Sequence, residues 1–173
     1  MPFTPLHMGP GIFIKAIMRG SFSLLVFGFA QIIMDIQPLI VMISGKGHLH
    51  GFSHTYMGAT LIALFSALIG KYLSDIMIKK LVSESSPKMN QLMGNPSHVS
   101  WGIAIISALM GTFSHVFLDS IMHADVEPYF PITGANGMYG FISIDNLEKF
   151  CLYSGLVGGL VYFMLVIFLS RKA

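Results

Sequence analysis

Long apolar blocks separated by shorter polar segments dominate the chain. Three blocks, at residues 22–43, 56–78 and 99–122, contain few charged side chains, and a fourth follows at residues 150–169. A membrane-spanning helix needs about 20 mostly apolar residues, because each residue advances the helix by about 1.5 Å and the hydrocarbon core is about 30 Å thick. The pattern therefore predicts four transmembrane helices.

Two polar segments separate these blocks. The first follows the second block, is broken by Pro87 and Pro96, and is typical of a solvent-exposed connector. The second, residues 124–149, contains further prolines and the turn-rich stretch TGANGMYG, which predicts a long structured loop.

The segment that precedes the first block is too short to cross a bilayer. Residues 8–19 predict a short N-terminal helix with two open placements. It could lie at the cytoplasmic interface, or it could descend from the outside and turn back at Arg19 and Gly20.

Composition supports this interpretation. The 173 residues are 54% hydrophobic and 10% charged, whereas a soluble domain carries about a quarter charged residues. Disorder and most soluble folds are therefore excluded. We expect one all-α domain over residues 1–173, an integral membrane helical bundle of four transmembrane helices plus a short N-terminal helix.

The basic residues predict an orientation. Of the ten Lys and Arg residues, only Lys46 and Lys149 fall in the segments 44–55 and 124–149. Because basic residues concentrate on the cytoplasmic side, we expect those two segments to face outward from a membrane that the chain crosses several times. The other eight are Lys15, Arg19, Lys71, Lys79, Lys80, Lys88, Arg171 and Lys172.

Several classes of function lack support. A net charge of +2 without a basic run makes a nucleic-acid partner unexpected. The single cysteine, Cys151, excludes an intramolecular disulfide and a zinc ribbon. The sequence contains no H-E-x-x-H, G-x-S-x-G or Walker motif, so zincin, serine esterase and ATPase chemistry are not indicated. The oligomeric state is left open.

Ionisable residues inside the apolar blocks are the candidates for function, because charges are costly in a membrane. Asp35 lies in the first block, and His115, Asp119 and His123 follow one another at intervals of four in the third. On a helix the first two share a face, and the third is rotated by about 80°.

A second group of histidines lies where the second helix is expected to begin. His50 and His54 are four residues apart, and His48 lies two residues earlier. The predicted topology places these residues at the same end of the bundle as the first group. Nitrogen and carboxylate ligands without a thiolate suit zinc, and also manganese or iron, so we expect one or two divalent metal ions. The other interpretation is a hydrogen-bonded His and Asp cluster that holds the helices together.

His7 belongs to this cluster only if the short N-terminal helix descends from the outside, because only then does His7 reach the level of Asp35. The metal hypothesis favours that placement. The expected ligands are His7, Asp35, His50, His54, His115, Asp119 and His123, with His48 as the alternative to His50.

The order of these residues resembles that of membrane-bound metal-dependent hydrolases related to LexA-regulated inner-membrane hydrolases. The resemblance covers residues 1–135. It rests on an early histidine (His7), on Asp35, on the segment 51–55 with His54, and on S-H-x-x-x-D at residues 114–119. Only the first aspartate of the family's P-D-x-D is present, at Asp35, and the first histidine of H-R-G-x-T-H-S falls on Leu49. The H-x-x-x-D pair is also similar to that of zinc-dependent phospholipase C. Both resemblances imply hydrolysis at a metal centre.

The segment after the third block supplies further acidic groups. Glu127 or Asp125 could transfer a proton during hydrolysis, because a carboxylate near a metal-activated water can accept or return one. At this depth in the membrane, we expect a phosphoester of a lipid or a lipid-linked molecule as substrate. The alternatives are a metal-ion or proton transporter and a scaffold stabilised by a metal.

Overall fold

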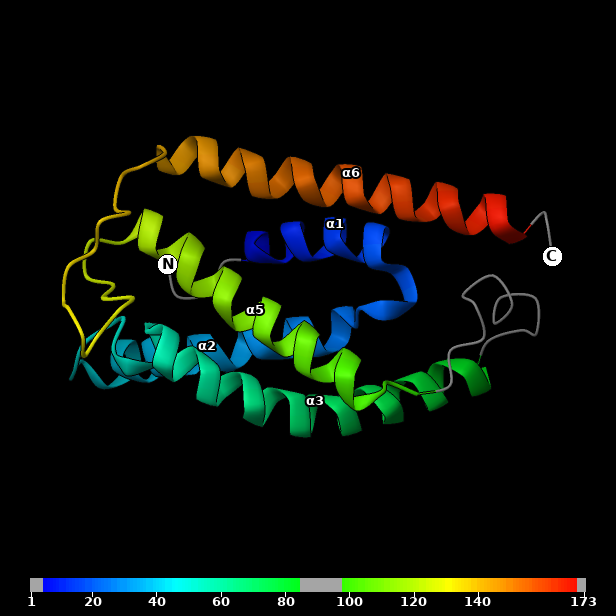
Figure 1. Cartoon of the computed structure of the whole chain (residues 1–173), viewed down its shortest axis with the longest axis horizontal. Helices are drawn as coiled ribbons and strands as arrows, with labels where there is room; N and C mark the ends of the chain where they lie inside the picture. The colour runs from blue at the N-terminus through cyan, green and yellow to red at the C-terminus, as the bar shows by residue number, and fades with distance from the viewer. Residues whose placement is uncertain (1–4, 85–97, 171–173) are drawn as a thin grey trace.

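The computed structural model of the chain describes residues 5–84 and 98–170, and this part contains helices and no β-strand (Figure 1). Its elements are η1 (Pro5–His7), α1 (Met8–Met18), η2 (Arg19–Ser21), α2 (Leu24–Ser44), η3 (Phe52–His54), α3 (Tyr56–Glu84), α5 (Trp101–Met122) and α6 (Ile144–Ser170).

Four of these helices, α2, α3, α5 and α6, are long and apolar enough to cross a membrane, with mean hydropathies between 1.6 and 2.1. The predicted all-helical fold with four such helices and a short N-terminal helix is therefore confirmed. Four spans of this kind indicate a multi-pass membrane protein.

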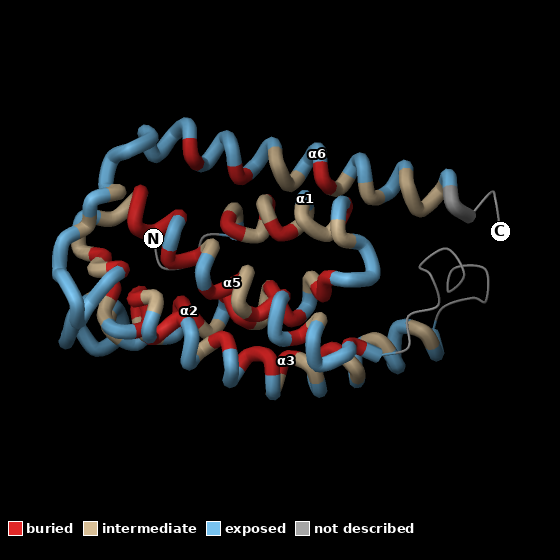
Figure 2. The backbone as a smooth tube through the Cα atoms, in the orientation of Figure 1, coloured by how far each residue is buried: buried red, intermediate tan, exposed pale blue. Residues whose placement is uncertain are grey.

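Small side chains hold α2, α3 and α5 together. Ala30 of α2, Ala63 of α3 and Ala108 of α5 are buried in one core cluster, and Figure 2 shows buried residues concentrated where these helices meet. Small residues let helix backbones approach closely where lipid provides no hydrophobic driving force. The hydroxyls of Ser23 and Ser100 accept hydrogen bonds from the first turns of α2 and α5 and fix where these helices begin.

The short α1 takes the descending placement. The chain reverses at η2, where Lys15 Nζ donates hydrogen bonds to the carbonyls of Arg19 (2.6 Å) and Phe22 (2.7 Å). Arg19 has a φ of 49°, the left-handed backbone of a tight reversal. Helix α2 then runs back beside α1, so that His7 and Asp35 lie at the same end of the bundle.

The predicted loop at 124–149 is too long, because α6 begins at Ile144 and includes its last six residues. Ser143 Oγ accepts a hydrogen bond from Asn146 N (3.4 Å), and Lys149 pairs with Asp145 one turn away at 2.6 Å. These polar residues form the first turns of the helix ahead of its apolar block. Helix α3 likewise extends past residue 78 to Glu84. The connector with Pro87 and Pro96 lies outside the described residues.

Glycines allow α1 and α6 to lie in close contact (Figure 1). A Cβ on Gly158 would lie 2.5 Å from the backbone nitrogen of Phe13, whereas a Cβ on the adjacent Gly159 would meet nothing within 4 Å. The backbone of Gly9 similarly approaches the carbonyl of Cys151 so closely that no Cβ would fit there. This packing fixes α1, and therefore the His7 that precedes it.

We expect Gly158→Ala to destabilise the protein by about 1–3 kcal/mol, because the added methyl group forces α1 and α6 apart. Gly159→Ala is the matched control and should be neutral or slightly stabilising, since alanine is the better helix former. Thermal unfolding of both variants in detergent micelles measures the difference. Equal effects of the two substitutions would contradict this account of the helix contact.

Candidate metal centre

Helix α5 provides the centre of the cluster. His115 and Asp119 lie one turn apart on its buried face, and His115 Nε2 is 3.2 Å from Asp119 Oδ2. The spacing of four residues produces this pairing, as predicted from the sequence.

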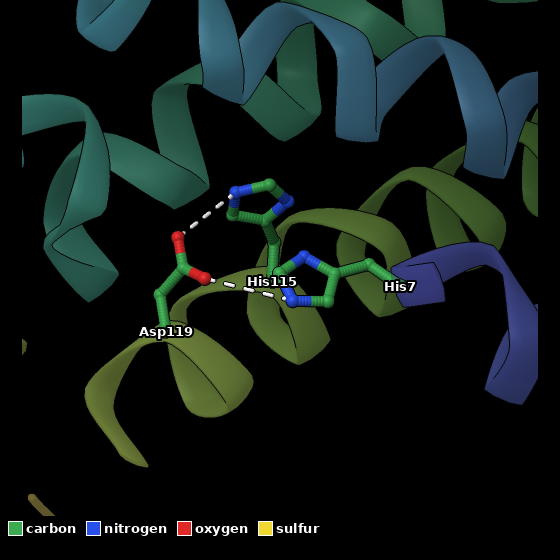
Figure 3. A group of neighbouring side chains, drawn as sticks. All are labelled: His7, His115 and Asp119. Carbon is green, nitrogen blue, oxygen red and sulfur yellow. Dashed lines mark ion pairs between the residues drawn. The ribbon is translucent and has the colours of Figure 1, made fainter. Parts of the chain in front are cut away.

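His7 reaches the same carboxylate from η1. Its Nε2 lies 3.6 Å from Asp119 Oδ1, and its ring packs edge-on against that of His115, with 5.0 Å between the ring centroids. Figure 3 shows both rings directed toward the two oxygens of Asp119. Residues more than a hundred positions apart therefore meet at one buried carboxylate.

Two further elements complete the cluster. Asp35 of α2 places Oδ1 at 3.3 Å from His115 Nε2, and His54 at the end of η3 places Nε2 at 3.1 Å from Asp119 Oδ2. His7, Asp35, His54, His115 and Asp119, all predicted as ligands, thus come together from four elements.

The ring nitrogens in this cluster have an unusual environment. Nε2 of His54, Nε2 of His115 and both nitrogens of His7 are buried without a hydrogen bond in the described part of the chain, although carboxylate oxygens lie close to the three Nε2 atoms. A buried polar atom without a partner costs about 1–3 kcal/mol. A cation that accepts these lone pairs and faces the carboxylates would satisfy all of them, so the residues fit a divalent metal.

The contact between His115 Nδ1 and Gln31 determines which ring nitrogen of His115 is left to face the cluster. His115 Nδ1 lies 2.6 Å from Gln31 Oε1, while Gln31 Nε2 donates to the Gly111 carbonyl at 3.1 Å. Because the amide nitrogen already faces a carbonyl, the amide oxygen must be the acceptor for Nδ1–H. Nε2 is therefore the nitrogen of His115 that faces the carboxylates of the cluster and is left to act as a ligand, the arrangement found in metal-binding histidines.

His54 and His50 are held in the same way. His54 Nδ1 lies 2.9 Å from Ser53 Oγ, and His50 Nδ1 lies 2.9 Å from Asp125 Oδ2. Gln37 Oε1 accepts a hydrogen bond from Ser53 N and fixes the segment that carries both histidines. Each ring thus keeps Nε2 available.

The segment before α3 does not continue the helix, so the four-residue spacing of His50 and His54 is not a helical turn. His50 lies in a turn and His54 in the 3₁₀ turn η3, because the helix begins only at Tyr56. Of the two alternatives left by the sequence, His50 is buried in the cluster, whereas His48 is exposed.

His123 occupies a peripheral position. It forms the C-cap of α5 and stacks on His50, with 4.3 Å between the ring centroids. Its ligand atom lies with those of His50 and Asp125, at the point where the chain leaves the helix.

Burial keeps the histidines outside the spans neutral. Desolvation lowers the pKa of His7 to about 4, against the opposing effect of Asp119, and it also lowers the pKa values of His50 and His123. Burial alone would raise the pKa of Asp125, but the hydrogen bond and charge of His50, together with backbone hydrogen bonds, outweigh this effect and lower the pKa. At neutral pH these rings are neutral and Asp125 is ionised, the protonation states that metal binding requires.

The geometry supports four overlapping groups that could hold a metal ion, each with ligand atoms within 4.8 Å of one another. They are His7, His115 and Asp119; Asp35, His54 and His115; His50, His54 and Asp119; and His50, His123 and Asp125.

A cavity of about 270 Å³ adjoins the cluster and reaches it through His50. Glu127 lines this cavity, while Asp125, the other predicted catalytic acid, is engaged by His50. Tyr56 N donates a hydrogen bond to the Pro128 carbonyl at 2.8 Å, which ties the segment that carries Glu127 to the start of α3. The cavity is lined by His48, His50, Gly51, Phe52, Thr55, Glu127 and Phe130.

Sequence reasoning missed Gln31 and Ser53, which orient the ligand rings. The signal for Gln31 was a polar residue inside the first apolar block, one helical turn before Asp35. Nothing in the local pattern distinguishes Ser53 from an ordinary turn residue.

The model of one protein family, described as a domain of unknown function (DUF4184), matches residues 1–171. The chain belongs to the DUF4184 family. No curated protein and no solved structure matches it. The arrangement of the residues themselves must therefore guide any proposal of function for this DUF4184 chain.

We expect Gln31→Leu to weaken divalent metal binding by about 10–100-fold, because His115 Nδ1–H loses its acceptor. Gln31→Glu is the matched control, since its carboxylate can still accept that hydrogen bond, and it should retain more of the affinity. Competition titration with a chromophoric zinc chelator measures both. An unchanged affinity in Gln31→Leu would show that this hydrogen bond does not support a metal ligand.

Proposed function

We propose that the chain is an integral-membrane hydrolase that uses a divalent metal to cleave a phosphoester of a lipid or lipid-linked substrate. The observation that carries the proposal is the set of buried imidazole nitrogens that surround Asp119 without hydrogen bonds, beside a cavity with a carboxylate on its wall. His50, one of the proposed ligands, and Glu127, the proposed proton acceptor, line the same cavity, as hydrolysis requires.

Zinc is the metal that we propose, because the donors are imidazoles and carboxylates without a thiolate. When bound, a divalent cation would lower the pKa of a water molecule toward about 7 and polarise a phosphoester oxygen.

Glu127 is the residue to which we assign proton transfer. Its carboxylate would take a proton from the attacking water and return it to the oxygen of the departing alcohol, so that water adds to phosphorus as the P–O bond breaks. Asp125 is a positioning residue in this scheme, because its carboxylate accepts the Nδ1–H of His50.

Exposed apolar side chains near the cavity support a lipid substrate. Ile132 and Phe141, in the segment between α5 and α6, are 90% and 81% exposed, and Phe52 and Phe130 line the cavity itself. Apolar side chains exposed in this way can contact a membrane lipid. A lipid could keep its chains among them while its phosphate reaches Glu127.

The distribution of buried ionisable groups favours hydrolysis over transport. Within residues 5–84 and 98–168, every buried His and Asp belongs to the cluster, and the other buried polar side chains are uncharged ones such as Ser66 and Ser107. A proton or ion path across the bilayer needs a series of such groups. The cavity with Glu127 likewise favours catalysis over a scaffold role.

The activity test uses purified protein in mixed micelles with zinc. We expect it to release phosphate or a phosphorylated head group from phosphatidic acid, phosphatidylglycerol or a polyprenyl diphosphate. Asp119→Asn should abolish both activity and metal binding. Glu127→Gln should lower kcat by about 10²–10⁴-fold with zinc retained, and His98→Gln, at the other end of α5, should change neither.

Two results would contradict this proposal. One is the absence of hydrolysis of all three lipids by protein that contains zinc. The other is full activity in Glu127→Gln, which would assign the proton transfer elsewhere.

The proposed location is a bacterial-type inner membrane with the site toward its outer face. In a Cys151→Ala background, we expect a membrane-impermeant maleimide to label Lys46→Cys on intact cells. Lys79→Cys should be labelled only after permeabilisation, because it lies toward the other end of α3. The reverse pattern would place the site on the cytoplasmic side.

A further inference from the structure

The overlap among the possible metal groups limits how they can be filled. Three of the four groups are entirely buried, and they share residues: His115 belongs to two of them, His54 to two, and Asp119 to two. The number of ions therefore depends on how often each side chain can act as a ligand.

Each of three histidines can bind only one ion. The Nδ1 atoms of His50, His54 and His115 are already engaged by Asp125, Ser53 and Gln31. Only Nε2 remains on each ring, and one lone pair binds one cation.

Filling the middle group, Asp35 with His54 and His115, would use one histidine from each of the other buried groups. His7 would then be left with Asp119 as its sole remaining partner, while His50 would keep the group that it forms with His123 and Asp125. For His7 this is costly, because its side chain is 4% exposed and neither ring nitrogen has a hydrogen bond within the described chain.

The remaining arrangement gives every buried histidine one role. His7 and His115 form one group with Asp119, and His50 and His54 form the other. These two groups share nothing except Asp119, whose carboxylate has two oxygens. Oδ1 faces His7 at 3.6 Å, and Oδ2 faces both His115 at 3.2 Å and His54 at 3.1 Å.

We propose that the centre holds two divalent cations bridged by the carboxylate of Asp119. His7 and His115 bind the first, with Asp35 as a further ligand, since its Oδ1 lies 3.3 Å from His115 Nε2. His50 and His54 bind the second, which faces the cavity because His50 lines it. This inference rests on the proposed function and specifies how its metal centre is built.

Charge gives the arrangement a consequence for the substrate. Two divalent cations with the carboxylates of Asp35 and Asp119 leave a net charge of about +2, whereas one cation would leave the inner cluster neutral. The two-cation centre therefore attracts an anionic group such as a phosphoester, and two-metal sites characteristically stabilise the attacking and leaving oxygens of a displacement.

Metal stoichiometry tests the proposal directly. Protein in detergent is stripped with chelator, reloaded with Zn²⁺, passed over a desalting column and measured by inductively coupled plasma mass spectrometry. We expect two zinc ions per chain in the wild type, one in His7→Ala and one in His50→Ala. His48→Ala is the matched control from the same segment and should retain two.

The outcomes separate this inference from the proposed function. One zinc per chain in the wild type, unchanged in His50→Ala, overturns the two-cation centre and leaves a hydrolase with one metal. No zinc in the wild type overturns both.

A second measurement needs no variant that could fail to fold. Wild-type protein loaded with Mn²⁺ should give the electron paramagnetic resonance spectrum of an exchange-coupled pair, because one carboxylate bridges the ions. A spectrum of isolated Mn²⁺ at full loading would contradict the bridge.

Discussion

The Asp119 carboxylate is buried among imidazole rings, and the helices must pack so that these rings reach it. An ionised carboxylate without compensation inside an apolar bundle costs several kcal/mol, and here the compensation comes from outside its own helix as well as from His115. His7 and His54 approach from η1 and η3. The fold must therefore place both ends of the α1–α2 hairpin, and the segment before α3, next to the C-terminal end of α5.

Local hydrogen bonds and close helix contacts hold these segments in place. The reversal at Arg19, held by Lys15, sends α2 back beside α1, and the glycine contacts with α6 fix α1 along its length. At the other end of the bundle, Asn136 Nδ2 donates to the carbonyls of Ser120 and His123 and holds the segment that follows α5. Rigid support of this kind is what a ligand cluster needs to keep its geometry.

Much of this could be predicted from the sequence because the membrane imposes a strong length and polarity rule. The four apolar blocks correspond to the four long helices, and the four-residue spacing correctly predicted that His115 and Asp119 lie on one face of α5. The choice between His48 and His50 could not be predicted, because the backbone there is a turn and follows no helical period. The start of α6 was missed for a related reason, since its first turns are polar.

Residues that orient a candidate ligand were the hardest to predict from the sequence. Gln31 orients His115 and Asp125 orients His50, and both depend on contacts between distant parts of the chain. Sequence spacing carries no information about such contacts. It also could not show that Asp119 presents one oxygen to His7 and the other to His115, which required the three-dimensional arrangement in Figure 3.

X-ray absorption spectroscopy at the zinc edge of purified, zinc-loaded protein identifies the atoms that coordinate the metal proposed for this cluster. Coordination by this cluster predicts a shell of nitrogen and oxygen atoms at about 2.0–2.2 Å with the multiple-scattering signature of several imidazoles and no sulfur shell. A sulfur shell near about 2.3 Å, or a spectrum without imidazole scattering, would show that the metal is bound elsewhere.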